Sequence, residues 1–200
     1  MTARALKVAA VVLAAGCSSR MAGRNKLLEL VDGKPVIVHV VNAAVESGAG
    51  PVIVITGFEA PLIEEVLRGA NVTIVHNAGY ERGLSSSLQT GLKALPPDID
   101  GALILLGDMP KIESSYLRAL LAAFADRQAI CVPIRKGRRG NPVLWGASYF
   151  QHIMRITGDM GAKPLMAKYS EHVIEVPIDS DGIFADVDTP SDLARLKTKR

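Results

Sequence analysis

The chain is poor in aromatic residues and in cysteine, and both shortages limit what it can be. Phe, Trp and Tyr together make up only 4% of its 200 residues. The core therefore has to be built from Ala, Val, Leu and Ile, which suits a parallel sheet covered by helices. The two cysteines, Cys17 and Cys131, are too few and too far apart for a zinc site or a disulfide framework.

The sequence also lacks long apolar runs and a strong charge of either sign. No run reaches the length of a membrane-spanning helix, and the N-terminus has no long apolar segment followed by a cleavage site. The net charge is a mild +3, without a basic stripe interleaved with aromatic residues. We therefore expect a cytoplasmic protein that binds neither a membrane nor nucleic acid. The four histidines show no spacing typical of a metal site or a catalytic triad, and we expect structural roles for them.

Strand-like and helix-like segments alternate along the first two thirds of the chain. Two hundred residues, 48% of them hydrophobic and 22% charged, are typical of one globular domain. The alternation predicts an α/β fold: a single-domain, doubly wound, Rossmann-like and mostly parallel sheet that binds ligands at the carboxyl ends of its strands. From Pro133 onward Gly and Pro break up the pattern, which predicts an inserted β-ribbon and helices that form one wall of a cleft. The expected strands are 8–13, 52–56, 72–75, 102–106 and 129–132, and the expected helices are 35–47, 59–67, 84–95 and 113–124.

The loop after the first expected strand is suited to a polyphosphate, although it has neither a G-x-x-x-x-G-K-[ST] nor a G-x-G-x-x-G motif. The strand passes into Ala14, Ala15 and Gly16, whose small side chains let a ligand approach the backbone N–H groups. Arg20 and Lys26 add positive charge within a dozen residues. The alternative is an ordinary strand-to-helix turn with a solvated arginine and lysine.

Carboxylates stand at two places where a metal ion would be useful. Asp108 follows the apolar strand 102–106 and precedes Pro110, which places it at the ligand-binding edge of the sheet. Such an oxygen ligand suits Mg²⁺, although a turn-forming aspartate gives the same pattern. Near the C-terminus, Asp186 and Asp188 point the same way if their segment is extended. Asp188 or its neighbour Thr189 could instead cap the final helix.

Three further segments carry polar groups next to glycines. Residues 76–88 follow a strand and open a helix with three serines. This arrangement suits the binding of a nucleobase and a ribose, but a serine-rich N-cap of a helix gives the same pattern. Residues 137–145 place paired arginines between glycines, and residues 157–163 contain a Gly-Asp-Met-Gly turn. Surface turns often have this composition.

Taken together, these motifs resemble those of the MobA-like nucleotidyltransferases, and within that family the molybdenum cofactor cytidylyltransferases. The matching segments are LAAG-x-S-x-RM-x-x-x-NK-L-L, N-x-x-x-x-x-G-L-S-x-S, LLGDMP, G-x-x-G-x-P and G-D-x-G-A-K, and they cover nearly the whole chain. The resemblance implies a Mg²⁺-dependent enzyme. It would transfer CMP from CTP to the terminal phosphate of the molybdenum–molybdopterin cofactor and release pyrophosphate. It also implies transient contact with a molybdoenzyme or its maturation chaperone.

The resemblance also implies roles for individual residues. Residues 1–132 would form a nucleotide-binding half, and residues 133–200 an acceptor-side half that carries the second metal ligand. The metal ligands would be Asp108 and Asp188, with Asp186 as a neighbour. The catalytic residues would be Arg20, Lys26 and Asp108. Nucleotide would be bound by Leu13, Ala14, Ala15, Gly16, Lys26, Asn77, Ser85, Ser87, Gly107 and Asp108. The acceptor would be bound by Arg139, Gly140, Asn141, Pro142, Asp159, Gly161 and Ala162.

Other functions stay open at this point. LAAG, where the guanylyltransferase branch has LAGG, favours CTP over GTP. GMP transfer to the same cofactor and nucleotide transfer to a sugar phosphate are the enzymatic alternatives. A carrier that delivers molybdopterin without catalysis is the non-enzymatic one, and both carboxylate sites and Lys26 argue against it. Arg20-Met21-Ala22-Gly23 departs from the usual Arg-Met-Gly, which leaves the loop shape open.

Overall fold

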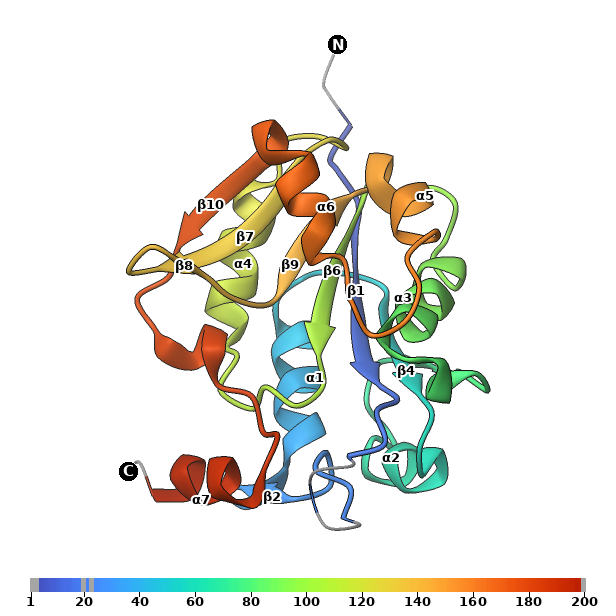
Figure 1. Cartoon of the computed structure of the whole chain (residues 1–200), viewed down its shortest axis with the longest axis vertical. Helices are drawn as coiled ribbons and strands as arrows, with labels where there is room; N and C mark the ends of the chain where they lie inside the picture. Colours follow the sequence, from blue (N-terminus) through green and yellow to red (C-terminus); the bar gives the residue numbers. More distant parts are fainter. Residues whose placement is uncertain (1–3, 19–20, 22–23, 199–200) are drawn as a thin grey trace.

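A computed structural model describes residues 4–18, 21 and 24–198 of the chain. Its centre is a mixed, mostly parallel sheet in which the order of strands is β10-β7-β9-β6-β1-β4-β5, with β8 paired to β7 (Figure 1). The strands of this sheet are β1 (Val8–Ala14), β4 (Val52–Thr56), β5 (Thr73–His76), β6 (Gly101–Leu106), β7 (Ile130–Arg135), β8 (Arg138–Arg139), β9 (Val143–Gly146) and β10 (Val173–Pro177). A separate small hairpin is formed by β2 (Leu30–Val31) and β3 (Lys34–Pro35). Within the described residues, no helix is both long and apolar enough to cross a membrane.

Helices cover both faces of the sheet, as the alternation of segments predicts. Every residue of β1 is buried, as expected for the central strand of a parallel sheet. Its even-numbered residues pack with α1, α2 and α4, whereas Val11 and Leu13 pack with α3, α5 and α6. The doubly wound α/β fold is therefore confirmed. The helices are α1 (Val36–Glu46), α2 (Ala60–Val66), α3 (Leu84–Lys93), α4 (Ser114–Ala123), α5 (Phe150–Ile153), α6 (Lys163–Lys168) and α7 (Pro190–Thr198).

The second half of the chain departs from the expected ribbon. Only the two residues of β8 form a ribbon with β7, while β9 enters the main sheet between β6 and β7 and runs antiparallel to both. All four residues of β9 are buried, and Trp145 lies opposite Ala102 on one side and Ile130 on the other. β10 then extends the sheet parallel to β7. Neither β9 nor β10 is among the strands predicted from the sequence.

The strands β1 and β6 end side by side at the edge where we expect ligands to bind. Leu13 of β1 pairs in register with Leu106 of β6, and Gly107 N donates a 2.9 Å hydrogen bond to Leu13 O. The chain returns to this edge near its end, where Val187 N donates a 2.9 Å hydrogen bond to Asp108 O. Figure 1 shows this final, red segment descending to the left of the arrowhead of β6 and leading to α7. Three distant parts of the chain therefore meet at one edge.

The opposite edge is held by Asp100, whose side chain is only 2% exposed. Its carboxylate accepts hydrogen bonds from the backbone N–H of Lys7 and from the guanidinium groups of Arg4 and Arg127. The Lys7 N–H and the two arginines hold the pKa of Asp100 below its usual value, although burial opposes them. This cluster fixes the segment that enters β1.

Candidate active site

A lysine and two carboxylates meet at the carboxyl edge of β1 and β6. Lys26 Nζ lies 2.5 Å from Asp108 Oδ2 and 2.8 Å from Asp188 Oδ1. Lys26 comes from the loop after β1, Asp108 from the turn after β6, and Asp188 from the segment before α7. Gly107 lets the turn after β6 pack closely against the end of β1, because a Cβ atom there would lie 2.8 Å from Leu13 O. The structure thus brings together three side chains that the sequence analysis had selected separately.

Asp188 is available for this cluster because another residue caps α7. Asp192 N donates a 3.3 Å hydrogen bond to Thr189 Oγ1, and Thr189 N donates a 2.9 Å hydrogen bond to Asp192 Oδ2. This reciprocal pair is a capping box with Thr189 as N-cap and Pro190 as the first helical residue. Of the two capping residues considered from the sequence, Thr189 is the one that caps, and the carboxylate of Asp188 faces Lys26 instead.

The cluster concentrates charge in a partly buried place. Burial raises the pKa of Asp108 above its usual value, against the opposing effect of Lys26, and the nearby charges of Asp186 and Asp188 raise it further. Burial alone would lower the pKa of Lys26, but Asp108 and Asp188 outweigh it, so that the pKa of Lys26 is raised. The lysine is therefore charged at neutral pH and balances the two carboxylates.

The same cluster has the oxygen atoms that a divalent cation needs. Asp108 Oδ1 is buried and has no hydrogen-bond partner. An unpaired buried carboxylate oxygen is costly unless a cation or donor reaches it. In the described part of the chain, no three His, Cys, Asp or Glu side chains gather as a metal site. Two carboxylates nevertheless fit Mg²⁺, which keeps several waters and takes further oxygens from substrate phosphates.

A cleft of about 390 Å³ opens directly beside the cluster. Its wall includes several of the residues expected to bind nucleotide, namely Leu13, Ala15, Gly16, Lys26, Ser87 and Asp108. Ala14 points the other way and packs in the core on the α1 side of the sheet. Arg20 lies outside the described residues. The wall also contains Cys17, Tyr80 and Glu81, which the sequence analysis did not select because no motif marks them.

The serine segment forms one side of this cleft through a network of its own. Asn77 Nδ2 donates hydrogen bonds to Ser86 Oγ at 2.9 Å and to Ser87 Oγ at 3.1 Å, while Asn77 Oδ1 accepts one from Gly79 N. Asn77 is only 4% exposed. Asn77 therefore fixes the loop, and Ser87 reaches the cleft wall. Ser85 is buried and is not among the residues that line the cleft.

A second cavity of about 420 Å³ adjoins the first and has a mostly apolar wall. The two cavities share four residues of their walls, Leu13, Leu84, Leu106 and Asp159. Of the residues expected on the acceptor side, Asn141, Asp159, Gly161 and Ala162 line it. Trp145, Lys163 and Met166 line it as well. Trp145 is at the same time buried in the core, since a core residue can also face a cavity.

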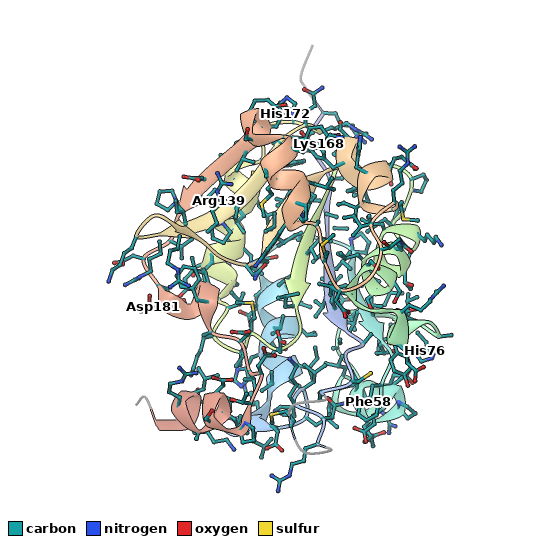
Figure 2. The ribbon with its side chains drawn as sticks, in the orientation of Figure 1. Phe58, His76, Arg139, Lys168, His172 and Asp181 are labelled. Atoms are coloured by element: carbon teal, nitrogen blue, oxygen red, sulfur yellow. The ribbon has the colours of Figure 1, made fainter. Side chains whose placement is uncertain are left out.

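Arg139, which the motifs place on the acceptor side, lines neither of the two cavities. Its Nε donates a 2.8 Å hydrogen bond to Glu175 Oε1, which joins β8 to β10. Figure 2 shows Arg139 near the β7–β10 edge of the sheet and not at the lower end where β1 and β6 finish. Gly140 and Pro142 flank Asn141 without lining either cavity, and a Cβ atom at Gly140 would lie 2.6 Å from Ile183 O. The structure therefore brings only part of the 137–145 segment to the site.

An α/β sheet with a charged cluster at its carboxyl edge and adjoining cavities is typical of proteins that bind small ligands at that edge. The chain belongs to the family of the MobA-like NTP transferase domain, whose model matches residues 10–173. It is thus a member of a nucleotidyltransferase family, and the resemblance seen in its motifs is confirmed.

Individual relatives differ in what their names say they do. A molybdenum cofactor cytidylyltransferase from Escherichia coli is 24% identical over 94% of this chain and 95% of its own length. The bifunctional protein GlmU of Syntrophomonas wolfei is 31% identical over 62% of this chain, but the match covers only 27% of that longer protein. Among solved structures, a nucleotidyl transferase from Methanothermobacter has a TM-score of 0.84 at 27% identity, over 96% of each chain.

Proposed function

We propose that this protein is a Mg²⁺-dependent cytidylyltransferase. It would transfer CMP from CTP to the terminal phosphate of the molybdenum–molybdopterin cofactor and release pyrophosphate. The observation that carries the proposal is the contact of Lys26 Nζ with Asp108 and Asp188, beside a cleft at the carboxyl ends of the strands that Lys26 and Asp108 line. Membership of a nucleotidyltransferase family and the near full-length similarity to the Escherichia coli cytidylyltransferase support it.

The residues of the cluster suit the transfer of a nucleotidyl group to a phosphate. A phosphate oxygen of the acceptor forms a bond to the α-phosphorus of the nucleotide, and the bond from that phosphorus to the pyrophosphate oxygen breaks. A phosphate nucleophile is already ionised, so the chain needs no general base and no covalent intermediate. Lys26 stabilises the negative charge that develops on the triphosphate. Arg20 would add to this effect, as the motif implies.

Asp108 and Asp188 are the residues that would hold Mg²⁺. The unpartnered buried oxygen of Asp108 and the adjacent Asp188 supply two hard oxygen ligands for it. When bound, the ion would neutralise phosphate charge. A solved structure of a mycobacterial relative, 26% identical to this chain, is described as a complex with manganese, which supports a divalent cation.

The adjoining cavity suits a flat heterocyclic acceptor better than a sugar. Its wall is mostly apolar, with Trp145, Ile104 and Val143 beside the polar groups of Asn141 and Asp159. A planar ring can bury its faces against apolar side chains and make hydrogen bonds at its edge. We assign the pterin to this cavity, so that residues 1–132 bind most of the nucleotide and residues 133–200 most of the acceptor.

Nucleotide transfer to a sugar phosphate is the second candidate, because of the similarity to GlmU. A sugar presents hydroxyl groups over most of its surface, and burying these without partners is costly. The apolar wall therefore favours the pterin. The expectations of a cytoplasmic location and of contact with a molybdoenzyme or its chaperone belong to the same proposal.

The direct test is to incubate the purified protein with Mg²⁺, one nucleoside triphosphate and one acceptor, and to measure pyrophosphate. We expect release with CTP and the molybdopterin cofactor, and much less with GTP or with a hexose 1-phosphate. Asp108→Asn is the matched control for background hydrolysis. Dominant use of GTP would place this chain in the guanylyltransferase branch. Dominant use of the sugar phosphate would show that the molybdopterin cofactor is not the acceptor.

A further inference from the structure

The loop between α5 and α6 is fastened to the start of α3. Leu84 N, at the first residue of α3, donates a 3.2 Å hydrogen bond to Asp159 Oδ1. The next backbone group, Ser85 N, donates a 3.1 Å hydrogen bond to Gly158 O. Figure 1 shows the orange segment between α5 and α6 passing beside the green helix α3. Two successive N–H groups of one element are thus satisfied by the other.

The packing around these hydrogen bonds is close on both sides. Gly83 has φ +93°, and a Cβ atom there would lie 2.3 Å from Asp159 Oδ1 and 2.9 Å from Gly158 O. A Cβ atom at Gly161 would lie 3.1 Å from Leu84 Cδ2. Glycines at these positions therefore permit the approach of the two backbones.

The joined elements together line both cavities, and α3 contributes Leu84 and Leu88 to the apolar one. α3 carries Ser87 to the wall of the cleft beside Lys26, and Gly161 and Ala162 line the adjoining apolar cavity. Asp159 itself lies on the walls of both. A displacement of the loop would change the acceptor side directly and would free the first N–H groups of α3 on the nucleotide side.

We propose that Asp159 is a positioning residue that couples the two cavities by holding this loop against α3. This rests on the proposed function for the assignment of nucleotide to one cavity and acceptor to the other. The role requires a hydrogen-bond acceptor at Oδ1 and not a negative charge, because the donor is a neutral backbone N–H. Asparagine can supply that acceptor and alanine cannot. A role that depends on the negative charge, such as pairing with a cationic group, would instead be lost in both variants.

Amide hydrogen exchange tests the contact without any ligand. In Asp159→Ala we expect the amides of residues 84–85 and 158–162 to exchange about fivefold faster than in the wild type, and in Asp159→Asn to stay within about twofold. Asp126→Ala is a matched control, since Asp126 Oδ1 accepts a 2.6 Å hydrogen bond from Gln128 N in a loop away from both cavities. Asp126→Ala should leave the exchange rates of those amides unchanged. Equal exchange in the wild type and Asp159→Ala would overturn the proposal.

Coupling is tested by adding Mg·CTP, the probe for the nucleotide side. In the wild type and in Asp159→Asn, we expect protection of residues 13–18 together with residues 158–162. In Asp159→Ala only residues 13–18 should be protected. If Asp159→Asn behaves like Asp159→Ala, the charge is needed and the positioning role is wrong. If Mg·CTP protects no part of the wild type, the proposed function fails, and the exchange measured without ligand still decides whether Asp159 holds the loop.

Discussion

Replacing Lys26 by methionine, which has a similar length and no charge, tests the central contact of the site. A cation placed at developing phosphate charge acts mainly on the transition state. Loss of one such group typically lowers kcat by about 10²–10³-fold. We expect Lys26→Met to show a loss of this size, with a much smaller change in the KM for CTP.

The structure also bounds the effect of this change on stability. Without the ammonium group 2.5 Å from its Oδ2, Asp108 is a partly buried carboxylate beside Asp188. The variant can avoid that charge by protonating Asp108, which costs about 4 kcal/mol at pH 7 for a carboxyl whose ordinary pKa is 3.8. The loss in free energy of unfolding at pH 7 should therefore be about 2–4 kcal/mol and not more.

The sign of the pH dependence follows from the raised pKa of Asp108. The ionised form of this carboxyl costs stability in the folded protein above its ordinary pKa, and removal of Lys26 increases that cost. The difference in the free energy of unfolding between Lys26→Met and the wild type should therefore become smaller as the pH falls from 7 toward 4. Binding of Mn²⁺ without nucleotide should become tighter in the variant, because the ammonium no longer competes for both carboxylates.

Urea denaturation at pH 7 and pH 4.5, pyrophosphate release and Mn²⁺ titration measure these three effects. Lys111→Met is a suitable control, since Lys111 follows Asp108 closely in the chain but forms a 2.7 Å ion pair with Asp32. It should change none of them appreciably. A Lys26→Met variant with unchanged kcat, raised KM for CTP and a stability loss independent of pH would refute the reasoning, because Lys26 would then only bind the ground state.

Four other changes have defined outcomes. Asp108→Asn should lower turnover by more than tenfold while the folded state persists in circular dichroism, since the site loses a metal ligand. Thr189→Ala should cost about 1 kcal/mol in urea denaturation and also lower kcat, because the capping box positions Asp188, and Thr189→Ser should restore both. Asp100→Asn should cost about 2 kcal/mol at pH 7. That loss should fade as the pH falls below about 4, because a depressed pKa contributes its full stability above the ordinary value of 3.8 and loses it as the pH falls through the lower pKa of the folded state. Arg139→Ala should leave the affinities for Mg·CTP and acceptor within about threefold, since its partner is Glu175, and a clear loss for the acceptor would return Arg139 to the site.

Much of the fold could be predicted because its signals are local. The strand expected at 52–56 has the bounds of β4, since a short β-branched run between turn residues has few other solutions. The helix expected at 84–95 ends two residues early, at Lys93, because Leu95 N donates its hydrogen bond to Leu92 O in a tighter final turn before Pro96-Pro97. β9 and β10 were missed because their four or five residues become strands only by pairing with β6 and β7.

The residues of the site could also be selected from local sequence patterns, whereas the contacts between them could not. Lys26, Asp108 and Asp188 each stand in a recognisable motif, and their selection needed no coordinates. Their mutual contact did need them, because it joins residues 82 and 162 positions apart. The hydrogen bond of Asp159 to α3 also spans 75 positions, and no pattern near Asp159 points to Leu84.

The place of Asp188 in the chain has a consequence for the newly made protein. On the ribosome, Lys26 and Asp108 emerge well before the segment that contains Asp188, and domains of this size generally fold as units. Until that last segment emerges, Lys26 can balance only Asp108, and the second oxygen ligand for a cation is missing. A chain that stops before this segment therefore lacks one of the two carboxylates that we propose hold the metal ion. We therefore expect the proposed site to be complete only after Asp188 has emerged.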